Sequence, residues 1–172
     1  AGVAETAGLI AATDAAGFSI EDYDPNTDSI RPVEVATAHV AAAKAAGDDL
    51  VLTARAENHL YGVNDLDDTI ARLVAYRDAG ADVVYAPGIS SAADIERVVT
   101  AVACPVNVLA VPGTPSIPEL AALGVARVSV GSLFAWAAYG ALASAATELL
   151  GPGTSDHRSG THPRSVRDAA FG

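Results

Sequence analysis

Two adjacent carboxylates follow a short apolar segment near the start of the chain. The segment reads GFSIEDYDP, which puts Glu21 and Asp22 at the end of a strand predicted over 18–20 and leaves Asp24 and Asp28 in the polar loop beyond it. Hard cations such as magnesium bind carboxylate oxygens, often through water. Such a cluster can also cap and solvate a loop, and the residue types alone favour that second interpretation.

An arginine follows the most continuously apolar strand of the sequence. The run LVLTA over 50–54 is typical of a strand buried on both faces, and Arg55 comes directly after it in LTARAENHLYG. An unpaired guanidinium would be costly there, so Arg55 needs an anionic partner. That partner is either a structural one, Glu57 or Glu21, or a substrate carboxylate held by two parallel hydrogen bonds. His59 is either a proton carrier or an exposed loop residue, and a lone loop histidine is more often the latter.

Two further polar positions stand next to predicted strands. Asn107 interrupts the apolar strand over 106–110, and a buried amide must find partners, either in neighbouring backbone or in a ligand oxygen. Gly131 and Ser132 precede the last helix, whose N-terminus can receive an anion, although capping explains Ser132 equally well. The sequence contains no GxSxG elbow, no Cys–His pair of suitable spacing and no cluster of zinc ligands.

Strands and helices that must position these residues alternate along the chain as far as residue 150. This alternation indicates a parallel α/β sheet, either open and doubly wound or part of an eight-stranded barrel. No Gly-rich dinucleotide fingerprint or P-loop follows any strand, whereas polar residues follow several strands, as at the mouth of a β/α barrel. The pattern therefore favours a barrel. Strands are predicted over 18–20, 50–54, 82–86, 106–110 and 127–130, and helices over 3–16 (closed by Gly17), 32–46, 65–79, 92–102, 116–123 and 134–150.

Length, charge and cysteine content narrow the class of protein. A chain of 172 residues can bury a real core, and an excess of 21 acidic over 10 basic residues argues against nucleic-acid binding, which needs a basic patch. The lone Cys104 excludes an internal disulfide and suits a reducing compartment. No apolar run approaches the ~20 residues that span a bilayer, so we expect no membrane association and a cytoplasmic protein.

Five segments together resemble the later barrel strands of the isocitrate lyase/phosphoenolpyruvate mutase superfamily. They are GFSIEDYDP, LVLTARAENHLYG, DLDDTIARLVAYRDAGADVVYAPG, PVNVLAVPG and ELAALGVARVSVGS, and the IED and AR-x-E strand ends are the most specific. The resemblance implies a partial TIM-type (β/α)8 barrel over 1–150, with about five parallel strands and flanking helices. The polar sequence beyond Gly151 lacks a hydrophobic stripe, so we expect a mobile C-terminal tail over 151–172.

The resemblance also implies site roles. Glu21 would belong to a Mg²⁺ site, through coordinated water, with Asp22 as a lesser candidate. Arg55 would contact the carboxylate end of the substrate, and Asn107, Glu57 and His59 are further substrate-binding candidates. The implied chemistry is the cleavage or formation of a C–C or P–C bond next to a 2-oxo or 2-hydroxy carboxylate, such as an oxaloacetate-like or phosphonopyruvate-like small molecule. Catalysis would then depend on Arg55 and Glu21.

Several departures from the family pattern shape these expectations. The aspartate-rich D-x-[DE]-x-G-Y-G metal motif is missing, the sequence has no Met, and the first three barrel strands are expected to be absent. The loop after the IED strand lacks a KKCGH-like sequence, so isocitrate and methylisocitrate lyase activities are not expected. The strand reading VVYAPG is followed by no Glu, and Asn26 is the only sign of a gating loop. We therefore expect little activity from this chain alone.

The resemblance further implies homo-oligomers in which the last helix is exchanged between neighbours, and the helix over 134–150, apolar nearly all round, suits that role. Two other kinds of protein fit the residues: a non-catalytic α/β binding module, complete in itself, and a phosphate-binding barrel of another family that ends at SVGS.

Overall fold

The computed structural model describes residues 2–157 and 164–171. The chain divides into two compact units, Ala1–Ser129 and Val130–Gly172, and each unit is described by itself. The first unit contains the main sheet and the candidate site. The second begins after the last strand and contains two helices.

The first unit is built around a sheet of five parallel strands in the order β1-β4-β5-β6-β7. The order of the strands in the sheet is their order along the chain, and a helix connects each neighbouring pair. This is the connectivity of a β/α barrel. The prediction of a partial TIM-type barrel with parallel strands is therefore confirmed. The strands are β1 (Gly17–Glu21), β4 (Val51–Arg55), β5 (Val83–Tyr85), β6 (Val106–Leu109) and β7 (Arg127–Ser129).

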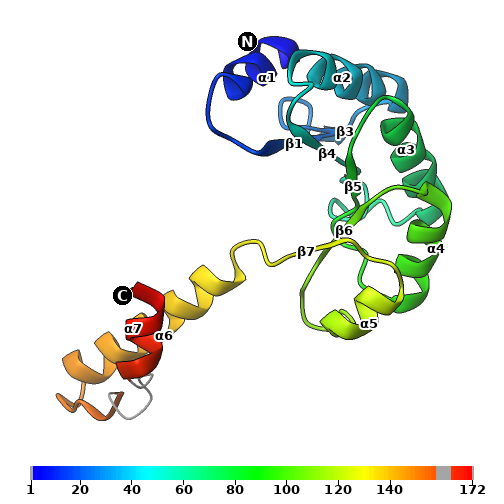
Figure 1. The fold of residues 1–172 in the computed structure, drawn as a ribbon. Helices are drawn as coiled ribbons and strands as arrows, with labels where there is room; N and C mark the ends of the chain where they lie inside the picture. Colours follow the sequence, from blue (N-terminus) through cyan, green and yellow to red (C-terminus); the bar gives the residue numbers. More distant parts are fainter. Residues whose placement is uncertain (1, 158–163, 172) are drawn as a thin grey trace. The chain divides into compact units, whose positions relative to one another are not determined.

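Helices cover one face of this sheet (Figure 1). Successive side chains of a strand point to opposite faces, and the even-numbered residues of β4, Leu52 and Ala54, are fully buried beneath the helices. Val84 of β5 and Leu73 and Tyr76 of α3 join them in the core. The helices are α1 (Val3–Ala11), α2 (Val33–Ala46), α3 (Leu66–Asp78), α4 (Ala92–Val102) and α5 (Ile117–Ala122).

Side-chain caps begin the two central helices. The carboxylate of Asp65 accepts a hydrogen bond from the backbone N–H of Asp68 at 3.0 Å, and the hydroxyl of Ser91 accepts one from Asp94 at 3.1 Å. Each cap satisfies a backbone donor that the first turn leaves without an intrahelical partner. Both helices begin within one residue of their predicted starts for this reason.

The first predicted helix is shorter than expected. It ends at Ala11, because the hydroxyl of Thr13 donates to the carbonyl of Ile10 at 2.7 Å and accepts from the N–H of Ala15 at 3.2 Å, which draws the chain out of the helix. Gly17 was predicted to close that helix and instead begins β1, where an added Cβ would lie 2.4 Å from the carbonyl oxygen of Val51. A side chain there would collide with the neighbouring strand.

The segment predicted as a plain polar loop after Asp22 contains a small antiparallel hairpin. Strand β2 (Tyr23–Asp24) pairs with β3 (Ser29–Ile30). The turn between them is held by the carboxylate of Asp24, which accepts the backbone N–H of Asn26 at 3.0 Å. The backbone N–H of Arg31 donates to the carbonyl of Asp22 at 2.8 Å, so both ends of the hairpin are attached to the end of β1.

The second unit holds α6 (Leu133–Leu150) and α7 (Arg164–Phe171). The 18 residues of α6 are long and apolar enough to cross a membrane by length and composition, and none of them is buried. The sequence-based expectation that no segment approaches this length and apolarity is therefore wrong, although one such helix is weak evidence for a membrane segment. Residues 158–163 of the predicted tail lie outside the described residues, and the tail boundary after 150 stays a prediction.

Candidate active site at the carboxyl ends of the strands

One row of residues crosses the sheet on the face opposite the helices. Parallel pairing joins Glu21 to Arg55, Arg55 to Tyr85, Tyr85 to Asn107, and Asn107 to Arg127. Paired residues of neighbouring strands point to the same side of a sheet, so these five side chains share one face. Glu21, Arg55 and Tyr85 are the last residues of their strands and lie at the carboxyl ends, where β/α barrels carry their sites. From there the row runs to Asn107, inside β6, and to Arg127, the first residue of β7.

Arg55 joins two carboxylates at the edge of this row. Its Nη1 lies 2.7 Å from Glu21 Oε1, and its Nε lies 2.6 Å from Glu57 Oε1. Glu57 and Glu21, the two structural partners of Arg55 considered from the sequence, are therefore both present. Glu21 and Arg55 meet on one face at the carboxyl ends of β1 and β4. Glu57 is 1% exposed, and burial raises the pKa of its carboxyl although the hydrogen bond from Arg55 acts in the opposite direction. The Nη2 of Arg55 has no hydrogen-bond partner among the described residues.

Tyr85 is a member of the row that the sequence analysis missed. The guanidinium carbon of Arg55 lies 5.2 Å from the centre of its ring, a cation–π arrangement that leaves the face of the ring under the positive charge. Burial raises the pKa of the Tyr85 phenol, so the hydroxyl stays a hydrogen-bond donor at neutral pH. The alternation of side chains along β5 places Tyr85 opposite the buried Val84 and so on the same face as Arg55.

Asn107 is held at both ends of its amide. Its Oδ1 accepts a hydrogen bond from Arg127 Nε at 2.9 Å, and its Nδ2 donates to the hydroxyl of Ser129 at 2.9 Å. Arg127 also donates from Nη2 to the hydroxyl of Thr53 at 3.0 Å. The partners of the buried amide are thus neighbouring side chains, and the role of Asn107 toward a substrate stays a prediction. Arg127 itself was not singled out from the sequence.

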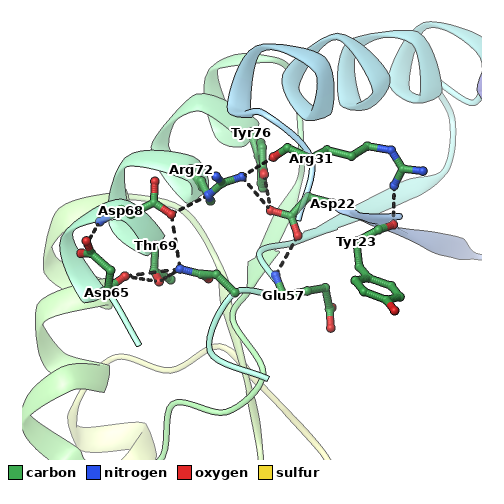
Figure 2. A network of polar contacts seen from close by, with 10 residues as sticks. Asp22, Tyr23, Arg31, Glu57, Asp65, Asp68, Thr69, Arg72 and Tyr76 are labelled. Carbon is green, nitrogen blue, oxygen red and sulfur yellow. Dashed lines mark hydrogen bonds and ion pairs between the residues drawn. The ribbon is translucent and has the colours of Figure 1, made fainter. Parts of the chain in front are cut away.

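The carboxylate of Asp22 points toward Arg72 and Tyr76 of α3, in the layer beneath the helices (Figure 2). Asp22 is 2% exposed, and three donors surround its carboxylate. The backbone N–H of Glu57 donates to Oδ1 at 2.8 Å, the hydroxyl of Tyr76 donates to Oδ2 at 2.6 Å, and Nη1 of Arg72 lies 3.3 Å from Oδ2. Neighbouring residues of a strand face opposite sides, so Glu21 and Asp22 cannot both face the row.

The network around Asp22 continues along α3. Arg72 donates from Nε to Asp68 at 2.7 Å and from Nη1 to the carbonyl of Arg31 at 2.9 Å. Burial alone would lower the pKa of Arg72, but hydrogen bonding to Asp68 and to Tyr76 raises it, and burial together with Asp22 raises the pKa of the Tyr76 phenol. The guanidinium and the phenol both stay protonated as donors to Asp22.

The first turn of α3 holds the segment that follows β4 (Figure 2). Asn58 is completely buried and donates from Nδ2 to the hydroxyl of Thr69 at 2.6 Å and to the carbonyl of Asp65 at 3.3 Å. Its Oδ1 is buried without a hydrogen-bond partner, as is the Nε2 of His59. His59 is half-buried, not an exposed loop histidine, and makes no hydrogen bond to the row.

The described residues offer few ligands for a magnesium ion. They contain no group of three or more His, Cys, Asp or Glu side chains that could hold a metal. Glu21 is 44% exposed at its side chain and engages Arg55 through one oxygen only, so its other oxygen can serve a water ligand of the ion. Asp22 is surrounded by protein donors. The fit within the described residues is therefore limited to a single carboxylate, Glu21.

A parallel sheet with connecting helices on one face and charged side chains at its carboxyl ends is the arrangement of β/α-barrel enzymes. The chain belongs to the phosphoenolpyruvate phosphomutase family, whose sequence pattern matches residues 1–150. The superfamily that was expected from the quoted segments is thereby confirmed.

Three similar proteins illustrate the match. The chain is 48% identical to a Burkholderia cenocepacia protein provisionally described as a lyase or mutase, with a TM-score of 0.90, covering 98% of this chain and 64% of that one. It is 36% identical to an uncharacterised Mycobacterium tuberculosis protein over 74% of this chain and 48% of that protein. It is 29% identical to oxaloacetate decarboxylase 2 of Pseudomonas fluorescens over 67% of this chain and 41% of that protein. The chain thus spans about half the length of these curated relatives or less.

Proposed function

We propose that the complete product of the gene encoding this chain is a magnesium-dependent lyase or mutase. It would cleave or form a C–C or P–C bond next to a 2-oxo or 2-hydroxy carboxylate, with an oxaloacetate-like or phosphonopyruvate-like acid as substrate. Membership in the phosphoenolpyruvate phosphomutase family and the likeness to an oxaloacetate decarboxylase support this class of reaction. The single observation that carries the proposal is the open Nη2 of Arg55 beside Glu21.

Arg55 has the chemistry to bind the substrate. Glu57 engages its Nε and Glu21 engages its Nη1, which leaves the donors of Nη2 for an acid group. A guanidinium held in this way presents fixed donors to a carboxylate and loses little conformational freedom on binding. Glu21 would hold magnesium through water, and the proposal requires further ligands from outside the described residues. When bound, magnesium supplies positive charge next to the oxygen that gains negative charge in the reaction.

The remaining candidates are proposed in supporting roles. Asn107 lies in β6, and Glu57 and His59 follow β4; we propose that these three side chains help to bind the substrate. The ring of Tyr85 stabilises the guanidinium of Arg55 through a cation–π contact. We propose that the protein is cytoplasmic and that neither nucleic acid nor a lipid bilayer is among its partners.

The test is a matched pair of conservative substitutions in the complete gene product. Arg55→Lys keeps the positive charge but loses the planar fork, and we expect kcat/KM for oxaloacetate or phosphonopyruvate with Mg²⁺ to fall about 100-fold. Arg97→Lys alters an exposed ion pair with Asp67, 2.7 Å long, and should leave kcat/KM unchanged. Equal activity in wild type and Arg55→Lys would refute the role of Arg55, and undiminished turnover after chelation of divalent cations would refute the magnesium dependence.

We also propose that the protein forms homo-oligomers through α6. Large apolar side chains along this helix are exposed, among them Phe134 at 74%, Trp136 at 67% and Leu142 at 66%. Exposed apolar area on this scale is typical of a surface that packs against another protein chain. Size-exclusion chromatography with light scattering gives the mass directly, and a monomer at micromolar concentration would contradict this proposal.

A further inference from the structure

The carboxylate of Asp22 links the ends of two strands. It follows Glu21 at the end of β1, and its Oδ1 accepts the backbone N–H of Glu57, which follows β4, at 2.8 Å. The pairing of β1 with β4 ends at Glu21 and Arg55, so this hydrogen bond lies just beyond the last backbone pair. Backbone hydrogen bonds hold the chain as far as Ala56, because the N–H of Asp22 donates to the carbonyl of Arg55 at 3.3 Å and the N–H of Ala56 to that of Tyr85 at 2.9 Å. The carboxylate of Asp22 extends this attachment by one residue and fixes the backbone of Glu57 to the end of β1.

Glu57 transmits this position to Arg55. Its buried carboxylate accepts the Nε–H of Arg55 at 2.6 Å, and that contact orients the guanidinium plane. With Nε fixed, Nη1 reaches Glu21 at 2.7 Å and Nη2 is left open. A displacement of the Glu57 backbone would turn the fork of Arg55 away from this orientation.

Asp22 is in turn held from α3. Tyr76 donates to Oδ2 at 2.6 Å, and Arg72, which Asp68 fixes through Nε, lies 3.3 Å from the same oxygen. Burying a carboxylate is costly unless it is paired and hydrogen-bonded, and here each oxygen has a donor. The charged group is therefore rigid, which is the property that a positioning residue needs.

We propose that Asp22 is a positioning residue, which acts through Glu57 to hold the guanidinium of Arg55 ready for a substrate carboxylate. The binding of a substrate carboxylate by Arg55 rests on the proposed function. The effect of Asp22 on the orientation of Arg55 can be measured without any substrate. The carboxylate of Asp22 acts on Arg55 through Glu57 and has its own hydrogen bonds with Glu57, Tyr76 and Arg72, so its role is one of positioning.

The readout is the Nε–H signal of Arg55 in ¹H–¹⁵N spectra. An Asn at position 22 has one acceptor oxygen and an NH₂ group, so it cannot serve both the Glu57 N–H and Arg72, which only donates. In Asp22→Asn we expect the Arg55 Nε–H to exchange with water about 10-fold faster or more, with a proton shift closer to that of an exposed arginine. Asp67→Asn, which removes the exposed partner of Arg97, is the matched control and should leave the Arg55 signal unchanged.

An Arg55 signal that is the same in folded Asp22→Asn and in wild type would overturn the proposal. If circular dichroism shows that Asp22→Asn does not fold, Tyr76→Phe decides the question. It removes one donor to Asp22 and should accelerate exchange at Arg55 about threefold or more, whereas unchanged exchange there would also overturn the proposal.

Titration with oxalate and Mg²⁺ separates this proposal from the proposed function. If wild type binds oxalate and Asp22→Asn binds it about 10-fold more weakly, both are supported. If the complete gene product does not bind oxalate while the Arg55 signal still responds to Asp22→Asn, positioning stands and the assigned substrate class fails. If Asp22→Asn binds oxalate as tightly as wild type and its Arg55 signal is unchanged, positioning fails and the proposed function stands.

Discussion

Replacing Tyr76 with Phe removes a single hydroxyl from a buried polar contact of the first unit. The hydroxyl donates to Asp22 Oδ2 at 2.6 Å, and the two residues are 1% and 2% exposed. The ring of Phe fills the same space, so the core around Leu73 and Val84 should not change. The substitution therefore isolates one hydrogen bond to a buried carboxylate.

The expected loss follows from the charge of the acceptor. Hydrogen bonds to charged groups contribute about 1.5–3 kcal/mol to the free energy of unfolding, and removal of one donor leaves part of a buried carboxylate unsatisfied. Arg72 continues to contact the same oxygen, so we expect about 2 kcal/mol. With a urea dependence of about 1.5 kcal/mol per molar, the midpoint of unfolding should fall by about 1.3 M.

Urea unfolding followed by far-UV circular dichroism measures this shift. Tyr61→Phe is the matched control, because its ring is 45% exposed and its hydroxyl has no hydrogen-bond partner among the described residues, so its midpoint should change little. A Tyr76→Phe midpoint equal to that of Tyr61→Phe would refute the assignment of a strong buried hydrogen bond.

Two further predictions concern backbone and pH. Gly88 has φ +96°, and an added Cβ would lie 3.0 Å from the backbone of His59, whereas Gly62 has φ +82° and nothing within 4 Å. Gly62→Ala should cost about 1 kcal/mol and Gly88→Ala about 3 kcal/mol in urea unfolding, and equal losses would contradict the steric argument. Hydrogen bonding, first from Thr154, lowers the pKa of Glu148 from 4.5 to about 2. Because the folded pKa is depressed, its stabilising contribution is present above about pH 4.5 and is lost as pH falls through about 2. The amide shift of His157 should therefore show a titration step near pH 2, and that step should be missing in Glu148→Gln.

The elements and one edge of the site could be predicted from the sequence, because local patterns specify them. The apolar run before Arg55 indicated a buried strand, and the acidic and polar residues near Asp65 indicated the start of a helix. The meeting of Glu21 and Arg55 followed from parallel strands that end at the same edge of a sheet. These inferences needed only the periodicity of strands and helices.

The rest depended on contacts between residues far apart in the chain. Nothing local to Asp22 indicates that Arg72 and Tyr76, on a later helix, will occupy its carboxylate. One available signal was overlooked: adjacent residues of a strand point to opposite faces, so Asp22 had to face the helices if Glu21 faced the row. The contact of Arg127 with Asn107 likewise required the register of two strands, which no local pattern specifies.

The buried carboxylate has a consequence for how the strands find their alignment during folding. If β1 slid by one residue along β4, Phe18 and Ile20 would turn toward water and Glu21, with its longer side chain, would enter the space beneath α3. Arg72 would then lose the carboxylate of Asp22 as its partner, and a buried charge without a well-placed partner is strongly destabilising. We therefore expect Asp22 to discriminate against slipped pairings, so that its replacement by an apolar residue would broaden the ensemble of strand alignments even where it did not lower stability.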